Sequence, residues 1–241
     1  MSATTLDPFT IEIIKDSLNV IGDEMFVSLQ RTSKSPIIYE VLDYCCGITD
    51  EKGQLLAQGN GVAGFLGTLT FAVHSVLDKF GAENLNPGDI FITNDPYTGG
   101  GTHLSDVSLV MPIFYQNQVV AFSANKAHWT EVGGKDPGSW TTDSTDVFQE
   151  GLQFPCVRLF SRGEPNEALF DVIGANVRTP DMSLGDMWAQ VASCRLAGLR
   201  FQDLCDKHGL PSVREAIDIL LDYGEAMVAQ ELAKLPAGVY E

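Results

Sequence analysis

The residues of this chain best suited to chemistry are two histidines and an aspartate, His103, Asp106 and His128. The first two close the glycine-rich stretch 94–106, and the third lies in Lys126-Ala127-His128-Trp129. Imidazole and carboxylate ligands together suit a borderline or hard divalent cation such as Zn²⁺, Mn²⁺ or Fe²⁺. The pattern therefore predicts a metal site with three side-chain ligands. The competing interpretation is that His103 and Asp106 cap a turn and that His128 is a hydrogen-bonded histidine beside the core.

A predicted β-hairpin brings these residues together. Two strand-like runs, 107–114 and 119–125, are joined by residues 115–118, which we expect to form a four-residue turn. In such a hairpin, paired residue numbers sum to about 233, which places Asp106 opposite Ala127 and within one residue of His128. His103 lies just beyond the strand, where the preceding glycines allow the backbone to turn back.

The elements around this hairpin predict an α+β fold, with a mixed or antiparallel sheet, hairpins, flanking helices and a helical C-terminal region. Apolar residues recur at three- and four-residue steps from Pro8 to Gln30, which is typical of an amphipathic helix. Further helices are expected at 69–80, 184–207 and 212–235, and strands at 37–44, 47–49, 54–58 and 89–93, with another strand beginning within 235–241. We expect residues 1–165 to form a mixed α+β region that holds the metal site. Residues 166–241 are expected to form a helical region packed on the same domain.

Composition excludes several functions. A net charge of −17 and a pI near 4.4 argue against binding to nucleic acid or to an anionic membrane, since either needs a basic surface. No apolar run is long enough to span a membrane, and residues 1–7 lack the features of a signal peptide, so we expect a cytoplasmic protein. The five cysteines show neither a CxxC pair nor a disulfide-scaffold spacing, which predicts reduced, mostly buried thiols.

Other catalytic motifs fit poorly. Gly99-Gly100-Gly101-Thr102 is followed by His103, whereas a phosphate-binding loop needs Lys-Ser/Thr and a helix after its last glycine. The chain has no GxSxG motif for a serine nucleophile, and no partner for a nucleophilic cysteine can be identified. The long polar loop 133–145 beside the expected site is a candidate functional segment.

The motifs also resemble those of a known family, in order along nearly the whole chain. The matching segments are Arg31-Thr32-Ser33, Asp43, Pro87-Gly88-Asp89, Asn94-Asp95-Pro96-Tyr97, Gly100-Gly101-Thr102-His103-Leu104-Ser105-Asp106, Ala127-His128-Trp129, Gly133-Gly134, Pro137-Gly138-Ser139, Glu150-Gly151, Asn176-Val177-Arg178 and Gly185-Asp186. They resemble the hydantoinase B/oxoprolinase family, which includes the metal-bearing subunits of acetone carboxylase and caprolactamase and a subunit of acetophenone carboxylase.

The resemblance implies a divalent metal, Zn, Mn or Fe, held by Asp43, His103, Asp106 and His128. Pattern alone would give Asp43 only a turn-capping role. The resemblance also implies a hetero-oligomer in which a hydantoinase A-like subunit uses ATP to phosphorylate an amide or carbonyl oxygen of a small substrate. The metal-bearing subunit then hydrolyses the activated cyclic amide, hydantoin or oxoproline, or carboxylates the activated ketone enol. ATP is expected at the partner and not on this chain.

Further residues near these ligands have two interpretations each. Glu131 and Asp95 are candidates for orienting the ligating histidines or for catalysis, and both could equally be structural. Gly133-Gly134 could present backbone N–H groups to a substrate oxyanion or form a simple turn. The aromatic residues expected near the site, which would suit an apolar substrate, are Phe65, Phe71, Trp129 and Trp140.

Departures from the family pattern leave a second function open. Phe65 stands where many members have histidine, Glu131 replaces a usual aspartate, and members are commonly much longer, so this sequence corresponds to their N-terminal part. The first hypothesis is a catalytic metal subunit of an ATP-dependent carboxylase or amidohydrolase. The alternative is a non-catalytic assembly or regulatory subunit that retains the family fold.

Overall fold

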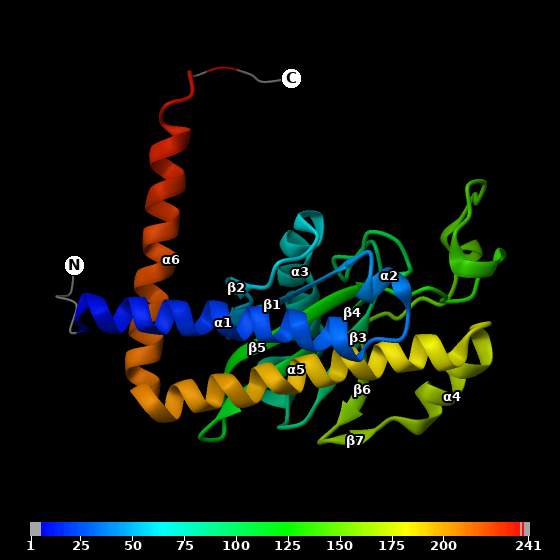
Figure 1. Ribbon diagram of the computed structural model, residues 1–241, viewed down its shortest axis with the longest axis horizontal. Coiled ribbons are helices and arrows are strands. Elements are labelled where there is room, and N and C mark those ends of the chain that lie inside the picture. The colour runs from blue at the N-terminus through cyan, green and yellow to red at the C-terminus, as the bar shows by residue number, and fades with distance from the viewer. Residues whose placement is uncertain (1–5, 237, 239–241) are drawn as a thin grey trace.

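A seven-stranded antiparallel sheet forms the centre of the protein (Figure 1), in a computed structural model that describes residues 6–236 and 238. The strands are β1 (Tyr44–Asp50), β2 (Leu55–Gln58), β3 (Ile90–Thr93), β4 (Asp106–Tyr115), β5 (Gln118–His128), β6 (Val157–Ser161) and β7 (Glu164–Pro165). Their order in the sheet is β2-β1-β5-β4-β3-β6-β7. The helices are α1 (Pro8–Thr32), α2 (Pro36–Tyr39), α3 (Ala63–Phe80), α4 (Glu167–Asn176), α5 (Pro180–His208) and α6 (Leu210–Leu232). The predicted α+β fold with a helical C-terminal region is confirmed.

Helices cover both faces of the sheet. The long helices α1 and α5 lie side by side on one face, where α5 packs on β4 and β5 and α1 packs on β1 and β2. Helix α3 packs on the other face, against β1, β5 and β4. The two faces have separate apolar clusters, and the adjacent Cys45 and Cys46 belong to different ones because neighbouring strand residues point to opposite faces. All five cysteines are free and buried, as predicted.

Local sequence explains the first helix. The Asp7 side chain accepts hydrogen bonds from the backbone N–H groups of Phe9 and Thr10, and Pro8 occupies the first turn, where its missing N–H is not needed. The apolar stripe that begins at Ile14 is buried against the sheet and α5. The helix ends at Thr32, two residues beyond the predicted boundary.

The strand predicted for residues 37–44 is wrong, because its first part is the short helix α2. Pro36 fixes a helical φ at the first position of this helix, and Ser35 before it is extended. The chain then turns through Leu42, which has a φ of 63°, and Asp43 N donates to Ile37 O. Asp43 therefore immediately precedes β1 at the edge of a turn, and only Tyr44 of the predicted segment belongs to a strand.

The central hairpin forms as predicted, with a register one residue different at its base. Gln116 and Asn117 both have positive φ and make a two-residue turn, shorter than the four residues expected. A β-bulge between Ile113 and Phe114 then shifts the pairing. As a result Asp106 lies opposite His128 and not opposite Ala127.

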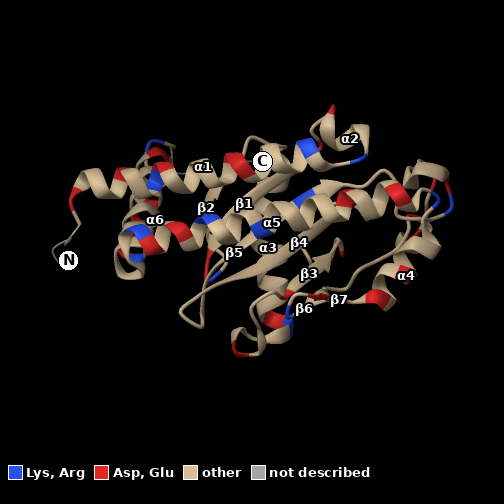
Figure 2. Cartoon of the chain, turned by 60° about the horizontal axis from the view of Figure 1, so that its bottom comes forward, with Lys and Arg blue, Asp and Glu red and all other residues tan. Residues whose placement is uncertain are grey.

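Helix α6 extends away from α1 and α5 (Figure 1), and residues 222–236 are all exposed. Acidic residues are distributed along the helices (Figure 2). Among the residues described, no helix is both long and apolar enough to cross a membrane. Most of the C-terminal segment expected to begin a strand, and most of the N-terminal residues considered for a signal peptide, lie outside the described residues.

Candidate metal centre

Three neighbouring strands bring the candidate ligands to one end of the sheet. Asp106 is the first residue of β4, His128 is the last residue of β5, and Asp43 directly precedes β1. Because β5 runs antiparallel to both of its neighbours, these three positions lie at the same end of the strands. His103 reaches this end from the glycine-rich loop before β4.

Asp106 lies at the centre of the cluster. Its Oδ1 atom lies 3.2 Å from His103 Nε2 and 3.2 Å from His128 Nδ1. One potential ligand atom from each of the three residues lies within 4.8 Å of the others, and the imidazole rings are 4.9 Å apart between centroids. The second oxygen, Oδ2, accepts a hydrogen bond from the Thr102 hydroxyl, a contact that no sequence signal indicated. The arrangement could hold a metal ion, since all three side chains point one donor atom at a common space.

Asp43 lies beside this cluster and not within it. Its Oδ2 atom is 3.8 Å from His128 Nδ1, and its backbone oxygen accepts a hydrogen bond from His128 N at 3.0 Å. The backbone bond fixes the position of Asp43 at the end of the β1–β5 ladder. The side chain is 29% exposed, whereas that of Asp106 is 1% exposed.

The surroundings of the cluster shift the pKa values of its two aspartates in opposite directions. Burial acts to raise the pKa of Asp106, but hydrogen bonds from His103 and His128 outweigh it and hold the pKa below its ordinary value. The hydrogen bond to Asp106 raises the pKa of His103. Burial raises the pKa of the Asp43 carboxyl. A bound cation would also stabilise the ionised form of Asp106.

A small cavity of about 210 Å³ opens onto His103. Its other lining residues are Ser139, Trp140, Thr141 and Glu150, which come from the predicted functional loop and from the segment after it. The Trp140 side chain is exposed, and its ring centroid is 6.1 Å from that of His103 and 6.2 Å from that of His128. The cavity gives a small molecule access to the most exposed of the candidate ligands.

The remaining aromatic residues lie elsewhere. Trp129 is completely buried in the apolar cluster on the side of the sheet covered by α1 and α5, where its Nε1 donates to Gln190 Oε1 at 2.7 Å. Phe65 is buried on α3, and Phe71 is exposed on the same helix. Of the four expected aromatic residues, only Trp140 lines the cavity at the candidate metal centre.

Asp95 organises the start of the glycine-rich loop. Its carboxylate accepts from Tyr97 N at 2.9 Å and from the Thr98 hydroxyl at 2.6 Å, and its backbone oxygen accepts from the N–H groups of Gly99 and Gly101. Burial acts to raise the pKa of Asp95, but the hydrogen bonds to its carboxylate, including those from Thr98 and Tyr97, hold the pKa below its ordinary value. These interactions all fix the loop, and none of them reaches a histidine.

Glu131 organises the loop after β5. Its buried carboxylate accepts from Gly133 N and Gly138 N, each at 2.8 Å, and pairs with Arg178 Nη1 at 2.9 Å. The N–H of Gly133 is therefore already hydrogen-bonded. Gly133 and Gly134 both have positive φ, which favours glycine at a turn. Glu131 thus positions the loop that carries Trp140.

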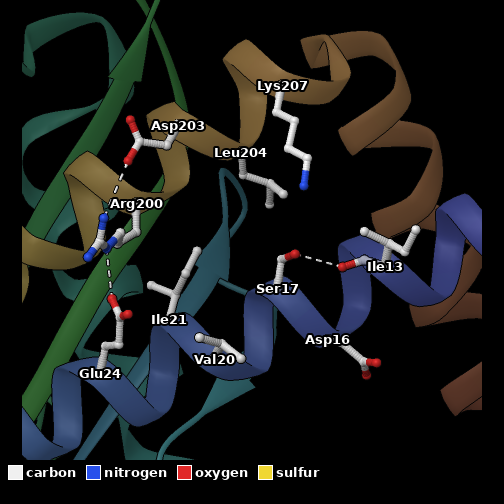
Figure 3. A pocket seen from close by; sticks show the side chains of 10 residues that line it. All are labelled: Ile13, Asp16, Ser17, Val20, Ile21, Glu24, Arg200, Asp203, Leu204 and Lys207. Carbon is white, nitrogen blue, oxygen red and sulfur yellow. Dashed lines mark hydrogen bonds and ion pairs between the residues drawn. The ribbon is translucent and has the colours of Figure 1, made fainter.

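A larger hollow, of about 590 Å³, lies between α1 and α5, away from the candidate metal centre (Figure 3). It is lined by apolar residues such as Val20 and Leu204 and by Arg200, which pairs with Glu24 and Asp203. It contains no cluster of candidate metal ligands among the described residues. Its volume alone does not make it the candidate active site.

Comparison with known proteins places these features in a family. The model of a family described as hydantoinase B/oxoprolinase matches residues 7–241. A protein of a Pseudomonas species, named as one subunit of a putative D-/L-hydantoinase, is 33% identical over 98% of this chain and 40% of its own length. The crystal structure of an ATP-dependent caprolactamase from Pseudomonas jessenii superposes with a TM-score of 0.91, at 29% identity, over 97% of this chain and 40% of that one.

A nucleotide-free acetone carboxylase shares the fold with a TM-score of 0.81 at 19% identity, over 87% of this chain and 28% of that one. The chain thus spans about 40% of the length of the hydantoinase and caprolactamase relatives.

Proposed function

Because this chain belongs to the hydantoinase B/oxoprolinase family, we propose that it is the metal-bearing part of an ATP-dependent enzyme that hydrolyses cyclic amides. The observation that carries the proposal is the convergence of His103, Asp106 and His128 on one space. We assign these three side chains and Asp43 as ligands of a divalent cation, Zn, Mn or Fe. Two neutral imidazoles and two carboxylates suit such an ion and leave positions open for substrate or water.

The bound ion would supply Lewis acidity toward a substrate oxygen and lower the pKa of a coordinated water. The protein would contribute position and access. Before an ion binds, Asp106 Oδ1 lies 3.2 Å from His103 Nε2 and from His128 Nδ1 and so orients both imidazoles. Trp140 and Glu150 border the cavity through which a small substrate would reach His103. Glu131 holds the loop that carries Trp140 in place.

The relatives favour a cyclic amide as the substrate class. Those about 30% identical are named as part of a hydantoinase and as a caprolactamase, whereas the acetone carboxylase is only 19% identical and supports the fold alone. The caprolactamase is described as ATP-dependent, and the chain lacks a phosphate-binding loop. We therefore place ATP use on a hydantoinase A-like partner in a hetero-oligomer.

The first test is the metal content of the chain purified without chelators. We expect near-stoichiometric metal in the wild type and in His74→Ala, and a loss of metal in His103→Ala. His74 is a suitable control because its Nε2 contacts Lys52 O, away from the candidate site. A folded wild type that takes up none of Zn, Mn and Fe would contradict the proposal and favour the assembly or regulatory role.

The second test is activity in the complete complex. The chain is combined with the ATP-dependent subunit and any polypeptide that supplies the rest of the relatives' length. Hydantoin, 5-oxoproline, caprolactam and acetone with bicarbonate are then compared as substrates. We expect ATP-dependent hydrolysis of a cyclic amide that His103→Ala abolishes and His74→Ala retains. If acetone with bicarbonate were the only substrate converted, the proposed activity would be ketone carboxylation instead of amide hydrolysis.

A further inference from the structure

Lys126 is a completely buried lysine on β5, two residues before His128. Residues two apart on a strand share one face of the sheet, so Lys126 lies on the face that carries His128. Its neighbours across the sheet are Ser108 on β4 and Cys45 on β1. A buried ammonium is unfavourable unless it is hydrogen-bonded, which makes its contacts informative.

The ammonium group of Lys126 connects the sheet to the glycine-rich loop. Its Nζ atom donates a hydrogen bond to Gly100 O and lies 5.7 Å from the centre of the Phe65 ring on α3. Gly100 is three residues before His103. Lys126 therefore joins the strand that carries one candidate ligand to the loop that carries another.

The glycine-rich loop fits tightly into this place. A Cβ at Gly99 would lie 2.2 Å from Thr93 Oγ1, and one at Gly100 would lie 2.5 Å from Thr68 O. Asp95 holds the beginning of the loop, and the Asn94 side chain holds its end by donating to Leu104 O at 2.7 Å. Lys126 supplies a side-chain contact to the middle of the loop.

We propose that Lys126 is a positioning residue for the metal centre, which fixes the loop at Gly100 and thereby sets the position of His103. His103 depends on such a contact because its side chain is 37% exposed and it does not belong to a strand. Asp106 and His128 are already placed by the β4–β5 ladder. Of the two measurements below, zinc affinity rests on the proposed metal function, whereas hydrogen exchange of the loop does not.

The experiment compares Lys126→Met, which keeps the apolar stem, with Lys126→Arg, which keeps a charged donor. Lys79→Met is the matched control, because Lys79 Nζ also donates to a backbone oxygen, Pro155 O at 2.7 Å, and lies 5.7 Å from the Phe80 ring. The first readout is amide hydrogen exchange of residues 99–103 in metal-free protein. The second is zinc affinity, measured by competition with a chelator.

Loss of a charge-assisted hydrogen bond predicts exchange at residues 99–103 about tenfold or more faster in Lys126→Met. We expect zinc affinity to fall by a similar factor, Lys126→Arg to recover most of both, and Lys79→Met to match the wild type. If Lys126→Met does not fold, Lys126→Gln replaces it in the same comparison.

A folded Lys126→Met protein with wild-type exchange and wild-type zinc affinity would overturn the proposal. Faster exchange throughout the protein, with zinc affinity unchanged, would show a general structural role instead. A wild type that binds no zinc, manganese or iron would remove the proposed function, while the exchange comparison would still test the contact with the loop.

Discussion

Asp106 and His128 are directly paired across the β4–β5 ladder, and Asp106 Oδ1 lies 3.2 Å from His128 Nδ1. Backbone hydrogen bonds between two central strands therefore set the spacing of two candidate ligands, which need no flexible loop to bring them together. The same oxygen of Asp106 also lies 3.2 Å from His103 Nε2, so one carboxylate orients both imidazoles. Such preorganisation reduces the ordering that a bound ion would have to impose.

The two aspartates should differ in their importance for metal binding. Asp106 is buried at the centre of the cluster, whereas Asp43 is partly exposed and 3.8 Å from its nearest candidate partner. We expect Asp106→Asn to lower metal affinity by at least about 100-fold and Asp43→Asn to lower it by about tenfold. Chelator competition measures both, with circular dichroism to verify folding. Equal losses in the two variants would show that Asp43 binds the ion as centrally as Asp106 does.

Removal of the Glu131 carboxylate should loosen the loop that carries Trp140. Glu131→Ala leaves the N–H groups of Gly133 and Gly138 and the Arg178 guanidinium without this acceptor. We expect a loss of about 2–3 kcal/mol in the free energy of unfolding and faster proteolysis within residues 133–145. Metal content should remain at the wild-type level. Metal loss in the folded variant would instead indicate that Glu131 orients a ligating histidine.

Trp140→Ala should alter substrate binding and leave stability nearly unchanged. The side chain is 68% exposed, and substitutions at such sites usually change the free energy of unfolding by no more than about 0.5 kcal/mol. Its ring borders the cavity at His103, so the KM for a cyclic amide should rise several-fold in the complete complex. Trp188→Ala provides a control, as another partly exposed tryptophan that packs on Phe160 and Phe170 instead. An unchanged KM in Trp140→Ala would place the substrate away from this ring.

Asp186 should make stability depend on pH. Burial raises the pKa of its carboxyl, although the carboxylate accepts from Lys34 N and Ser35 N. A pKa raised in the folded state stabilises the protein fully below the unfolded value, about 3.9, and this contribution is lost as pH rises through the folded-state pKa.

Asp186→Asn carries no charge in either state and should lack this dependence. The free energy of unfolding of the Asn variant, relative to wild type, should therefore increase as pH rises from about 3.9 through the folded-state pKa of Asp186. Urea unfolding of both proteins at several pH values measures the difference. A difference that falls with rising pH would mean that the two backbone hydrogen bonds outweigh burial.

Elements that depend on local patterns could be predicted from the order of the residues. The apolar period of residues 8–30 was sufficient to predict α1. Two strand-like runs on either side of a polar turn predicted the central hairpin, and through it the closeness of Asp106 and His128. Asp43 could be associated with these residues only through the family resemblance, since a single acid near a strand has no distinctive spacing.

Features that depend on contacts between distant segments became visible in the folded protein. The bulge at Ile113 and Phe114 moved the register by one residue, and Pro36 began a helix where a strand was expected. Burial of Trp129, the contacts of Glu131 with its loop, and the bond from Lys126 to Gly100 all arise where separate segments pack together. Such contacts follow from packing in three dimensions, because the periodicity of one segment contains no information about the surface that it meets.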